Sequence, residues 1–305
     1  MQGLVNLKSW GGGQDDLYEK IAKLGAVDTP FFSAINKYMP SRKAERWKGH
    51  SWRYEDMPTG KSSAGFLGGS APAEAESWGY SNSLNHYEIF KDTYGIEGSM
   101  EDAQNVEGKA ELARQKTMAA INHRLTIERS LFALDQAPVQ EDKANDVAGR
   151  MGSLDHWCVT ENTIDADDNI MSDTLLRNFA KIGGTDKGMP VTHIYVNDLV
   201  KDQIDDLFKA QVRRGAGGKV VEFPNYTEVK NLAYSPNIKI VYSRFIEQGL
   251  MFGVNMPSLA FVYQRLTKDE ELGRVKDAVE KEIITEATLR VNNPFAVCKM
   301  ENIKV

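Results

Sequence analysis

The chain has 305 residues, 41% of them hydrophobic and 26% charged, which is ordinary for a globular protein with a sizeable core. Its net charge of −6 excludes the basic footprint of a nucleic-acid-binding domain. No apolar run approaches the roughly 18 residues of a membrane span, and the N-terminal residues do not resemble a secretory signal. The two cysteines, Cys158 and Cys298, exclude a disulfide framework and favour a reducing cytoplasm.

Residues 1–42 are expected to form a mostly extended arm that contains one short helix. Asp15 or Asp16 is placed to cap that helix. The apolar residues of the helix follow at helical spacing: Leu17, Ile21 and Leu24. The Thr29-Pro30 pair begins a further turn.

Residues 43–98 read as a long hairpin. Its outgoing half is charged but carries aromatic side chains, and its middle is a loop of Gly, Ser, Ala and Pro. Its return half, residues 76–97, alternates with a period of two, which predicts one face of an extended strand. The large side chains at even positions are Trp78, Tyr80, Leu84, Phe90, Tyr94 and Ile96.

The length of this return strand has a structural consequence. Fully extended, residues 76–97 would span roughly 70 Å, whereas a compact domain of this size is about 50 Å across. The strand must therefore bend or project. A projecting hairpin with a one-sided aromatic face is unstable alone and favours contact with a neighbouring subunit. Two ordinary core strands joined by a loop are the alternative.

Residues 107–134 predict one helix about 42 Å long. One stripe on it comprises Met118, Ile121, Leu125 and Phe132. The opposite side carries Ile127, Leu131 and Leu134. The first half is therefore expected to be covered on one side and the second half on two. A polar loop follows at residues 135–153.

Mixed α/β structure is predicted from about residue 154 to residue 265. A strand at 192–196 leads to Asn197, a helix cap. The helix after it directs four residues toward a core: Val200, Ile204, Leu207 and Phe208. Residues 238–245 and 249–254 predict strands. A last segment alternates through Ile283, Thr285, Ala287, Leu289 and Val291.

The sequence offers no support for catalysis, and we predict no catalytic, cofactor-binding or metal-binding residue. The five histidines lack metal-ligand spacing, and His123 is expected to be solvated or hydrogen-bonded. The acidic run at 165–173 lacks the Gly and the final acid of a calcium loop, so weak cation binding there stays open. The GAGGK run at 215–219 fails the phosphate-loop pattern at two positions. Both cysteines are interpreted as small buried hydrophobic residues.

Three stretches, taken with the order of these parts, resemble a tailed-bacteriophage major capsid protein of the Hong Kong 97-type fold. One is NHYEIFKDTYGIEGSMEDAQNVEG leading into ELARQKTMAAINHRLTIERSLF, similar to a strand that enters a spine helix and including Glu128. Another is KEIITEATLRVNNPFAVCKMENI, which resembles the closing strands. The third is TPFFSAI followed by RWKGHSWRYEDM, which resembles the N-terminal arm and the outgoing strand of the E-loop hairpin.

The resemblance implies an α+β fold with four parts. Residues 1–42 would be the N-terminal arm, and residues 43–98 the E-loop hairpin that lies over an adjacent subunit. Residues 99–153 and 266–305 would form the peripheral domain around the spine helix. Residues 154–265 would form the axial domain, whose loops meet at capsomer centres. The candidate contact residues between subunits are Trp47, Trp52, Tyr54, Phe66, Trp78, Tyr80, Leu84, Arg213 and Arg214.

The implied function is that of a major capsid protein, assembled in the bacterial host cytoplasm as pentamers and hexamers of an icosahedral shell. That shell encloses double-stranded DNA without binding it tightly, and its further partners would be portal, scaffold and decoration proteins; no membrane is implied. An encapsulin-like compartment around an enzyme cargo is the alternative with the same fold. A cytosolic α/β enzyme with a site near Asp198 is a third hypothesis, which rests on one strand–helix junction.

Overall fold

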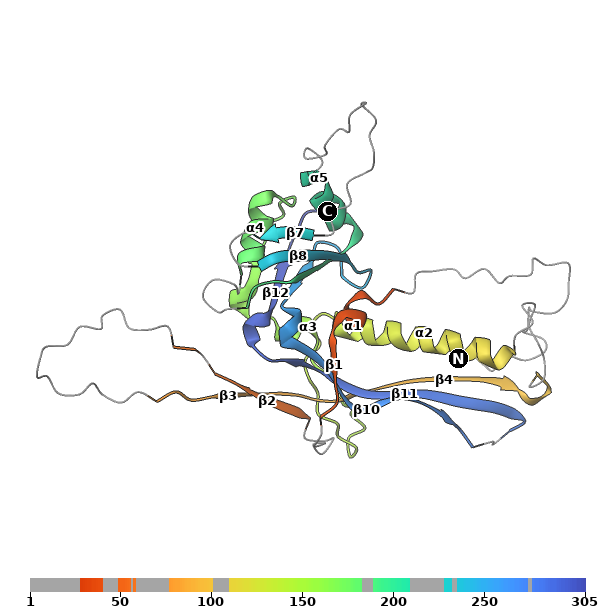
Figure 1. Ribbon diagram of the computed structural model, residues 1–305. Coiled ribbons are helices and arrows are strands. Elements are labelled where there is room, and N and C mark those ends of the chain that lie inside the picture. Colours follow the sequence, from red (N-terminus) through yellow and green to blue (C-terminus); the bar gives the residue numbers. More distant parts are fainter. Residues whose placement is uncertain are drawn as a thin grey trace, which may run out of the picture.

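The computed structural model describes residues 28–40, 49–55, 57–58, 77–100, 110–182, 189–208, 228–231, 235–273 and 276–305. These residues form a four-stranded sheet, a six-stranded sheet and a separate two-stranded hairpin. In Figure 1 the four-stranded sheet and the long helix α2 lie along the base, the six-stranded sheet rises above them, and the hairpin projects to the left. The expected α+β composition is confirmed.

The four-stranded sheet has the order β1-β10-β11-β4. Its strands are β1 (Asn36–Tyr38), β4 (Glu88–Glu97), β10 (Leu259–Glu271) and β11 (Ala278–Val291). β1 runs parallel to β10, and the other pairs are antiparallel. In β11 the odd positions expected inside are buried, and so are the intervening Ile284, Glu286 and Thr288. This strand is therefore enclosed on both faces, and alternation describes only half of its burial.

Helix α2 (Glu111–Leu131) lies over this sheet and is shorter than the predicted range of 107–134. Its second half buries Ile127 and Leu131, as expected. The predicted stripe is confirmed only in part: Phe132 is buried, Ile121 and Leu125 are half-buried, and Met118 is exposed. A polar contact joins the middle of the helix to the sheet: His123 Nδ1 lies 2.7 Å from a carboxylate oxygen of Asp92 on β4.

The six-stranded sheet has the order β5-β12-β9-β6-β8-β7. Its strands are β5 (Thr163–Asp165), β6 (His193–Val196), β7 (Glu228–Asn231), β8 (Ser235–Tyr242), β9 (Met251–Val254) and β12 (Val297–Glu301). Helices α4 (Asp173–Lys181) and α5 (Asp198–Phe208) share its core. The predicted cap is confirmed, because Asn197 Oδ1 accepts a hydrogen bond of 2.9 Å from the Val200 N–H.

The two sheets divide the chain differently from the predicted boundary between residues 265 and 266. β10 belongs to the four-stranded sheet and already begins at Leu259. β12 lies within the six-stranded sheet, between β5 and β9, although the boundary assigns it to the other unit. The chain thus passes from one sheet to the other after β9 and again after β11.

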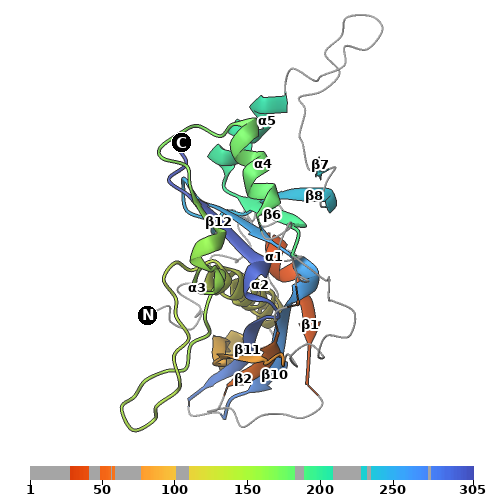
Figure 2. The same ribbon diagram turned by 90° about the vertical axis from the view of Figure 1, so that its left-hand side faces the viewer.

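The polar segment at 135–153 is more regular than a loop. Residues Val139 and Arg150 form an antiparallel bridge, and Asp142 and Val147 form a second one. Figure 2 shows this segment as a narrow tongue that extends away from both sheets toward the lower left. The short helix α3 (Leu154–Trp157) follows it and returns the chain to the six-stranded sheet.

The return strand expected at 76–97 divides into two strands. β3 (Ser81–Asn85) pairs antiparallel with β2 (His50–Tyr54), whereas β4 pairs with β11. The division falls at His86 and Tyr87. The extended segment is therefore interrupted, and its first part projects from the body with β2, which is one of the two outcomes that its length predicts (Figure 1).

Helix α1 (Pro30–Ala34) holds the N-terminal segment against α2 through one carboxylate. The two carboxylate oxygens of Glu128 accept hydrogen bonds from the Phe31 N–H at 2.9 Å and the Phe32 N–H at 2.6 Å. Arg124, one turn earlier on α2, donates to the Thr29 hydroxyl at 2.8 Å. These bonds satisfy the first N–H groups of α1, which have no partner within a helix.

Phe31 links the cores of the two sheets at this point. Its ring is fully buried and lies 5.3 Å from the rings of both Phe132, after α2, and Tyr195, on β6. Phe132 also contacts Phe252 on β9, with the ring centres 6.0 Å apart. One aromatic cluster therefore joins the spine helix, the N-terminal segment and the six-stranded sheet.

The protonation of Glu128 generates a testable pH dependence. Burial raises the pKa of this carboxyl from 4.5 to about 7, against the lowering by its two N–H partners and by Arg124. A carboxyl whose pKa is higher in the folded state stabilises that state at low pH, and the contribution is lost as the pH rises through the folded pKa. Glu128→Gln, which cannot ionise, should remove a change of about 3 kcal/mol in unfolding free energy between pH 4.5 and pH 8. Urea unfolding of unassembled subunits across this range measures it.

The exposed Glu161 supplies the control, since Glu161→Gln removes the same type of group where nothing buries it. Its pH profile should run parallel to that of the unsubstituted protein. A Glu128→Gln profile that is equally parallel would contradict the assignment.

Candidate functional site

The acidic turn at 165–173 is closed by its own hydrogen bonds. Asp165 Oδ1 accepts from the Asp167 N–H at 2.9 Å and from the Asn302 side chain at 3.0 Å. These bonds lower the pKa of the Asp165 carboxyl. Across the described part of the chain, no three His, Cys, Asp or Glu side chains gather in a way that could hold a metal ion.

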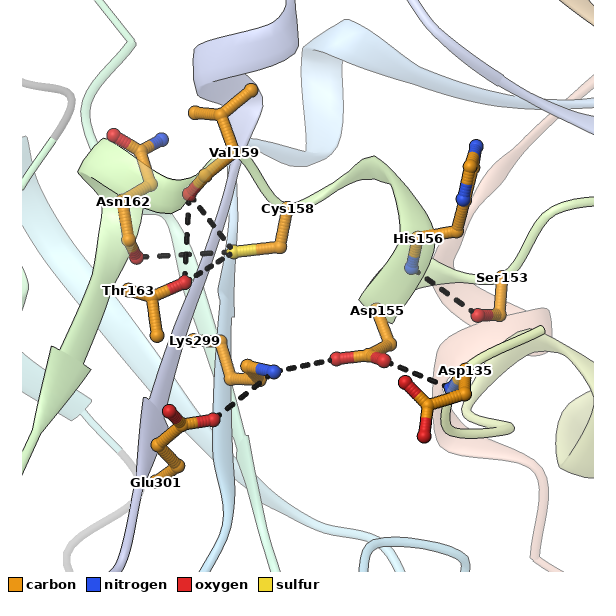
Figure 3. Close-up of polar contacts among 10 residues, drawn as sticks. All are labelled: Asp135, Ser153, Asp155, His156, Cys158, Val159, Asn162, Thr163, Lys299 and Glu301. Carbon is orange, nitrogen blue, oxygen red and sulfur yellow. Dashed lines mark hydrogen bonds and ion pairs between the residues drawn. The ribbon is translucent and has the colours of Figure 1, made fainter. Parts of the chain in front are cut away.

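A cluster of polar contacts lies where α3 meets β12 (Figure 3). Lys299 Nζ lies 2.8 Å from an Asp155 carboxylate oxygen and 3.1 Å from a Glu301 oxygen. Burial alone would lower the pKa of Lys299, but these carboxylates raise it. The lysine is therefore held as an ammonium group, which ties helix to strand and is no nucleophile.

Cys158, beside this cluster, is half-buried and makes polar contacts, which corrects its interpretation as a buried hydrophobic residue. Its sulfur lies 3.6 Å from the Thr163 hydroxyl and 3.8 Å from the Asn162 carbonyl oxygen (Figure 3). Burial raises the pKa of this thiol to about 11. A thiolate is the reactive form of cysteine, so this thiol is poorly reactive at neutral pH.

His123 belongs to a chain of hydrogen bonds that crosses the four-stranded sheet and is buried at His123 and Thr285. Asp92 contacts its Nδ1, and the Thr285 hydroxyl lies 2.7 Å from its Nε2. The Thr267 hydroxyl lies 2.7 Å from that of Thr285. The order of carboxylate, imidazole and hydroxyl is that of a catalytic triad, but Thr285 is fully buried and no substrate reaches it. The expectation of a hydrogen-bonded His123 is confirmed, and its contacts join α2 to the sheet.

The enzyme hypothesis gains nothing at Asp198. This residue is exposed at the start of α5, where its carboxylate accepts a hydrogen bond of 3.0 Å from the Leu199 N–H. That bond is an ordinary feature of a helix N-terminus.

The β2–β3 hairpin sorts the candidate contact residues by face. The cross-strand pairs His50–Asn85, Trp52–Ser83 and Tyr54–Ser81 place their side chains on one face. Trp52 on that face is buried against Trp157, with the ring centres 5.2 Å apart. Its prediction as a contact between subunits is therefore wrong, because Trp157 of the same chain covers the ring. Tyr54, on the same face, is half-buried.

The opposite face of the hairpin is open. Among the candidates, Trp78, Tyr80 and Leu84 are 64%, 57% and 42% exposed. The guanidinium of Arg53 lies 4.4 Å from the centre of the Tyr80 ring and holds it by a cation–π contact. We call Arg53, Trp78, Tyr80 and Leu84 the hairpin outer face. The same even-numbered pattern is buried in β4, at Phe90, Tyr94 and Ile96, so period alone cannot tell the two environments apart.

Four candidates lie outside the described residues: Trp47, Phe66, Arg213 and Arg214. The helix predicted near residues 15–24 and the Gly-rich loop at 213–219 lie outside them as well.

Sequence reasoning missed Asn85 and Asp155, and it singled out Glu128 only through the resemblance, without predicting its bonds to the N-terminal segment. The available signal for Glu128 was a carboxylate directly after Ile127, on the side of the helix that Leu131 also occupies. Asn85 and Asp155 gave no such signal, because their partners lie on segments distant in sequence.

No helix in the described part of the chain is long and apolar enough to cross a membrane. No individual curated protein matches the sequence. Several solved structures are similar, among them the cyanophage A-1(L) capsid asymmetric unit, with a TM-score of 0.63 and 11% identity over 98% of both chains. The satellite phage P4 procapsid matches with a TM-score of 0.55 and 14% identity, over 90% of this chain and 88% of that one.

The SrpI encapsulin of Synechococcus elongatus PCC 7942 matches almost as well, with a TM-score of 0.61 and 8% identity over 95% of this chain and 92% of that one. At such identities these likenesses establish the Hong Kong 97-type fold and do not separate a capsid from a compartment. The match to one protein family separates the two, because it covers residues 4–304 and the family is that of the SU10 major capsid protein. The chain therefore belongs to the SU10 major capsid protein family.

Proposed function

We propose that this phage major capsid protein assembles as pentamers and hexamers into an icosahedral shell around double-stranded DNA. The observation that carries the proposal is the hairpin outer face, which the described part of its own chain leaves uncovered. Isolated two-stranded hairpins are marginally stable in water, so this one gains stability from a surface to lie on. A neighbouring copy supplies that surface in a shell, and residues 43–98 then act as the E-loop.

The two larger sheets give the remaining parts of the proposal. The four-stranded sheet with α2 corresponds to a peripheral domain, and the six-stranded sheet with α4 and α5 to an axial domain. β10 joins the peripheral unit and β12 the axial unit, which revises the boundaries derived from sequence. The loop at 213–219, with Arg213 and Arg214, is proposed to meet its copies at capsomer centres.

The net charge of the subunit supports a shell that encloses DNA without binding it tightly. Affinity for DNA comes mainly from Lys and Arg groups that neutralise phosphates. A subunit of net charge −6 supplies little of it on average, which leaves a packaged genome free to move. Portal, scaffold and decoration proteins are the proposed further partners, and the host cytoplasm is the proposed place of assembly.

Substitutions on the two faces of the hairpin test the docking. Trp78→Ser combined with Tyr80→Ser should leave the unfolding midpoint of unassembled subunits unchanged, because both rings are exposed. Shell formation should fail, or need at least about thirtyfold more subunit, since a docked aromatic anchor contributes roughly 2 kcal/mol or more. Particle counts by electron microscopy and analytical ultracentrifugation measure this.

Trp52→Ser is the matched control from the inner face. It should destabilise the subunit itself by about 3–5 kcal/mol, the cost of removing a large buried aromatic side chain. If Trp78→Ser with Tyr80→Ser unfolds the subunit just as Trp52→Ser does, then Trp78 and Tyr80 are core residues and the docking proposal fails.

The contents of the shell separate a virion from a compartment. Particles isolated from lysed host cells should protect double-stranded DNA from added nuclease and should release it when the shell is denatured. Particles that instead contain a stoichiometric folded enzyme and no nuclease-resistant DNA would establish the encapsulin-like alternative.

A further inference from the structure

The base of the β2–β3 hairpin is fastened by one buried amide. Asn85 is the last residue of β3 and is fully buried. Its Nδ2 donates to the Leu289 carbonyl oxygen on β11 at 2.7 Å and reaches the Gly152 carbonyl oxygen at 3.4 Å. Its Oδ1 accepts from the Gly152 N–H at 2.7 Å. One side chain thus joins the hairpin, the four-stranded sheet and the end of the tongue at 135–153.

The groups around this amide are packed too closely to shift easily. A Cβ atom at Gly152 would lie 3.0 Å from the rings of both His156 and Trp157. Gly49, which enters β2, has a φ of +73°, and a Cβ there would lie 2.6 Å from the Asn85 carbonyl oxygen. The backbone approaches Asn85 closely from one side, and the Gly152 segment holds its amide from the other.

Beyond this base the hairpin acts as a lever. β2 and β3 form a sheet of their own, so no backbone pairing with a strand of the body fixes their direction. The hairpin is held at its base by the Asn85 bonds and by the packing of Trp52 against Trp157. The five residues of β3 span about 17 Å, so a rotation of about 10° at Asn85 moves the far end by about 3 Å. Preformed protein interfaces tolerate backbone shifts of about 1 Å or less. The orientation at the base therefore decides whether the hairpin outer face meets its partner.

We propose that Asn85 is a positioning residue for assembly, whose amide sets the direction in which the hairpin leaves the body and hence the angle between neighbouring subunits. The inference rests on the proposed docking of the hairpin on an adjacent copy. It assigns to Asn85 a role in the geometry of the shell that is separate from its contribution to the stability of the subunit.

Asn162 offers a matched control, because it is also a buried asparagine that bonds two backbone carbonyl oxygens. Its Nδ2 donates to Phe295 at 3.1 Å and to Val297 at 2.9 Å, in the six-stranded sheet and away from the hairpin. Asn85→Leu and Asn162→Leu each remove a buried side-chain amide, and Asn85→Leu also removes the acceptor of the Gly152 N–H. Both should lower the unfolding midpoint of subunits, Asn85→Leu by at least as much as Asn162→Leu.

The assembly products should separate the two variants. Asn162→Leu should form shells of the unsubstituted diameter, whereas Asn85→Leu should form about tenfold fewer of them, together with particles of other diameters and open sheets. Cryo-electron microscopy of assembly reactions measures the distribution. The proposal is overturned if Asn85→Leu shells are normal, or if Asn162→Leu broadens the distribution to the same extent. If Asn85→Leu does not fold, Asn85→Ser replaces it, and a failure of that variant to fold also overturns the proposal.

A distance measurement in unassembled subunits tests the orientation directly. Spin labels at Ser81→Cys on the hairpin and Arg177→Cys on α4 report the angle, and the native cysteines react slowly because burial raises the pKa of both thiols. The protein that retains Asn85 should give one narrow distribution of distances between the two labels. Asn85→Leu should give a broad or displaced distribution, and identical distributions would contradict the proposal. If the unsubstituted protein forms no shells at all, the proposed function fails, and this distance still decides the role of Asn85.

Discussion

The fold depends on the hydrogen bonds that the Glu128 carboxylate accepts from the Phe31 and Phe32 N–H groups, because they join the N-terminal segment to the spine helix. They place Phe31 between the ring after the spine helix and Tyr195 of the six-stranded sheet, so one aromatic cluster belongs to both cores. An unpaired carboxylate in such a place would be strongly destabilising, and two unpaired N–H groups would add to the cost. Each group is tolerated because it satisfies the other. The N-terminal segment is therefore an integral part of the body from residue 28 onward.

Much of the fold followed from periodicity and capping, because those signals are local. The strand at 192–196, the Asn197 cap and the spine helix lie where the sequence places them, give or take a few residues at the helix ends. The predicted stripe of the spine describes its burial only in part. At the middle of the helix a polar residue faces the sheet, because His123 bonds to Asp92 on β4, and a hydrophobic pattern does not predict such a position. Contacts between distant segments leave no periodic trace.

The candidate contact residues also show that local sequence patterns are predictable, whereas contacts between segments distant in sequence are not. Leu84 lies on the face of the hairpin opposite Trp52, Tyr80 contacts Arg53 of that same face, and Trp78 is exposed, in agreement with the predicted alternation. The alternation could not show that the residues before His86 and Tyr87 lie on an exposed hairpin, whereas the residues after them lie in β4 and pack under helix α2. Trp52 was misjudged because Trp157, which covers it, lies far along the chain. The aromatic content of this segment suggested an interface between subunits. Contacts within the folded chain decide which of these aromatic side chains stay exposed and can form it.

The position of β12 bears on how the subunit is made. This strand lies inside the six-stranded sheet, between β5 and β9, yet it is the last strand to be synthesised. β4 likewise waits for β11, from which nearly two hundred residues separate it in sequence. Contacts between such distant segments are slow to form, because the intervening chain must first close on itself. The four-stranded sheet is not complete until the ribosome has passed residue 291, and the six-stranded sheet not until it has passed residue 301, so a nascent chain presents no finished body on which another hairpin can settle. Translation thus orders the two events: each subunit folds first and joins a shell afterwards.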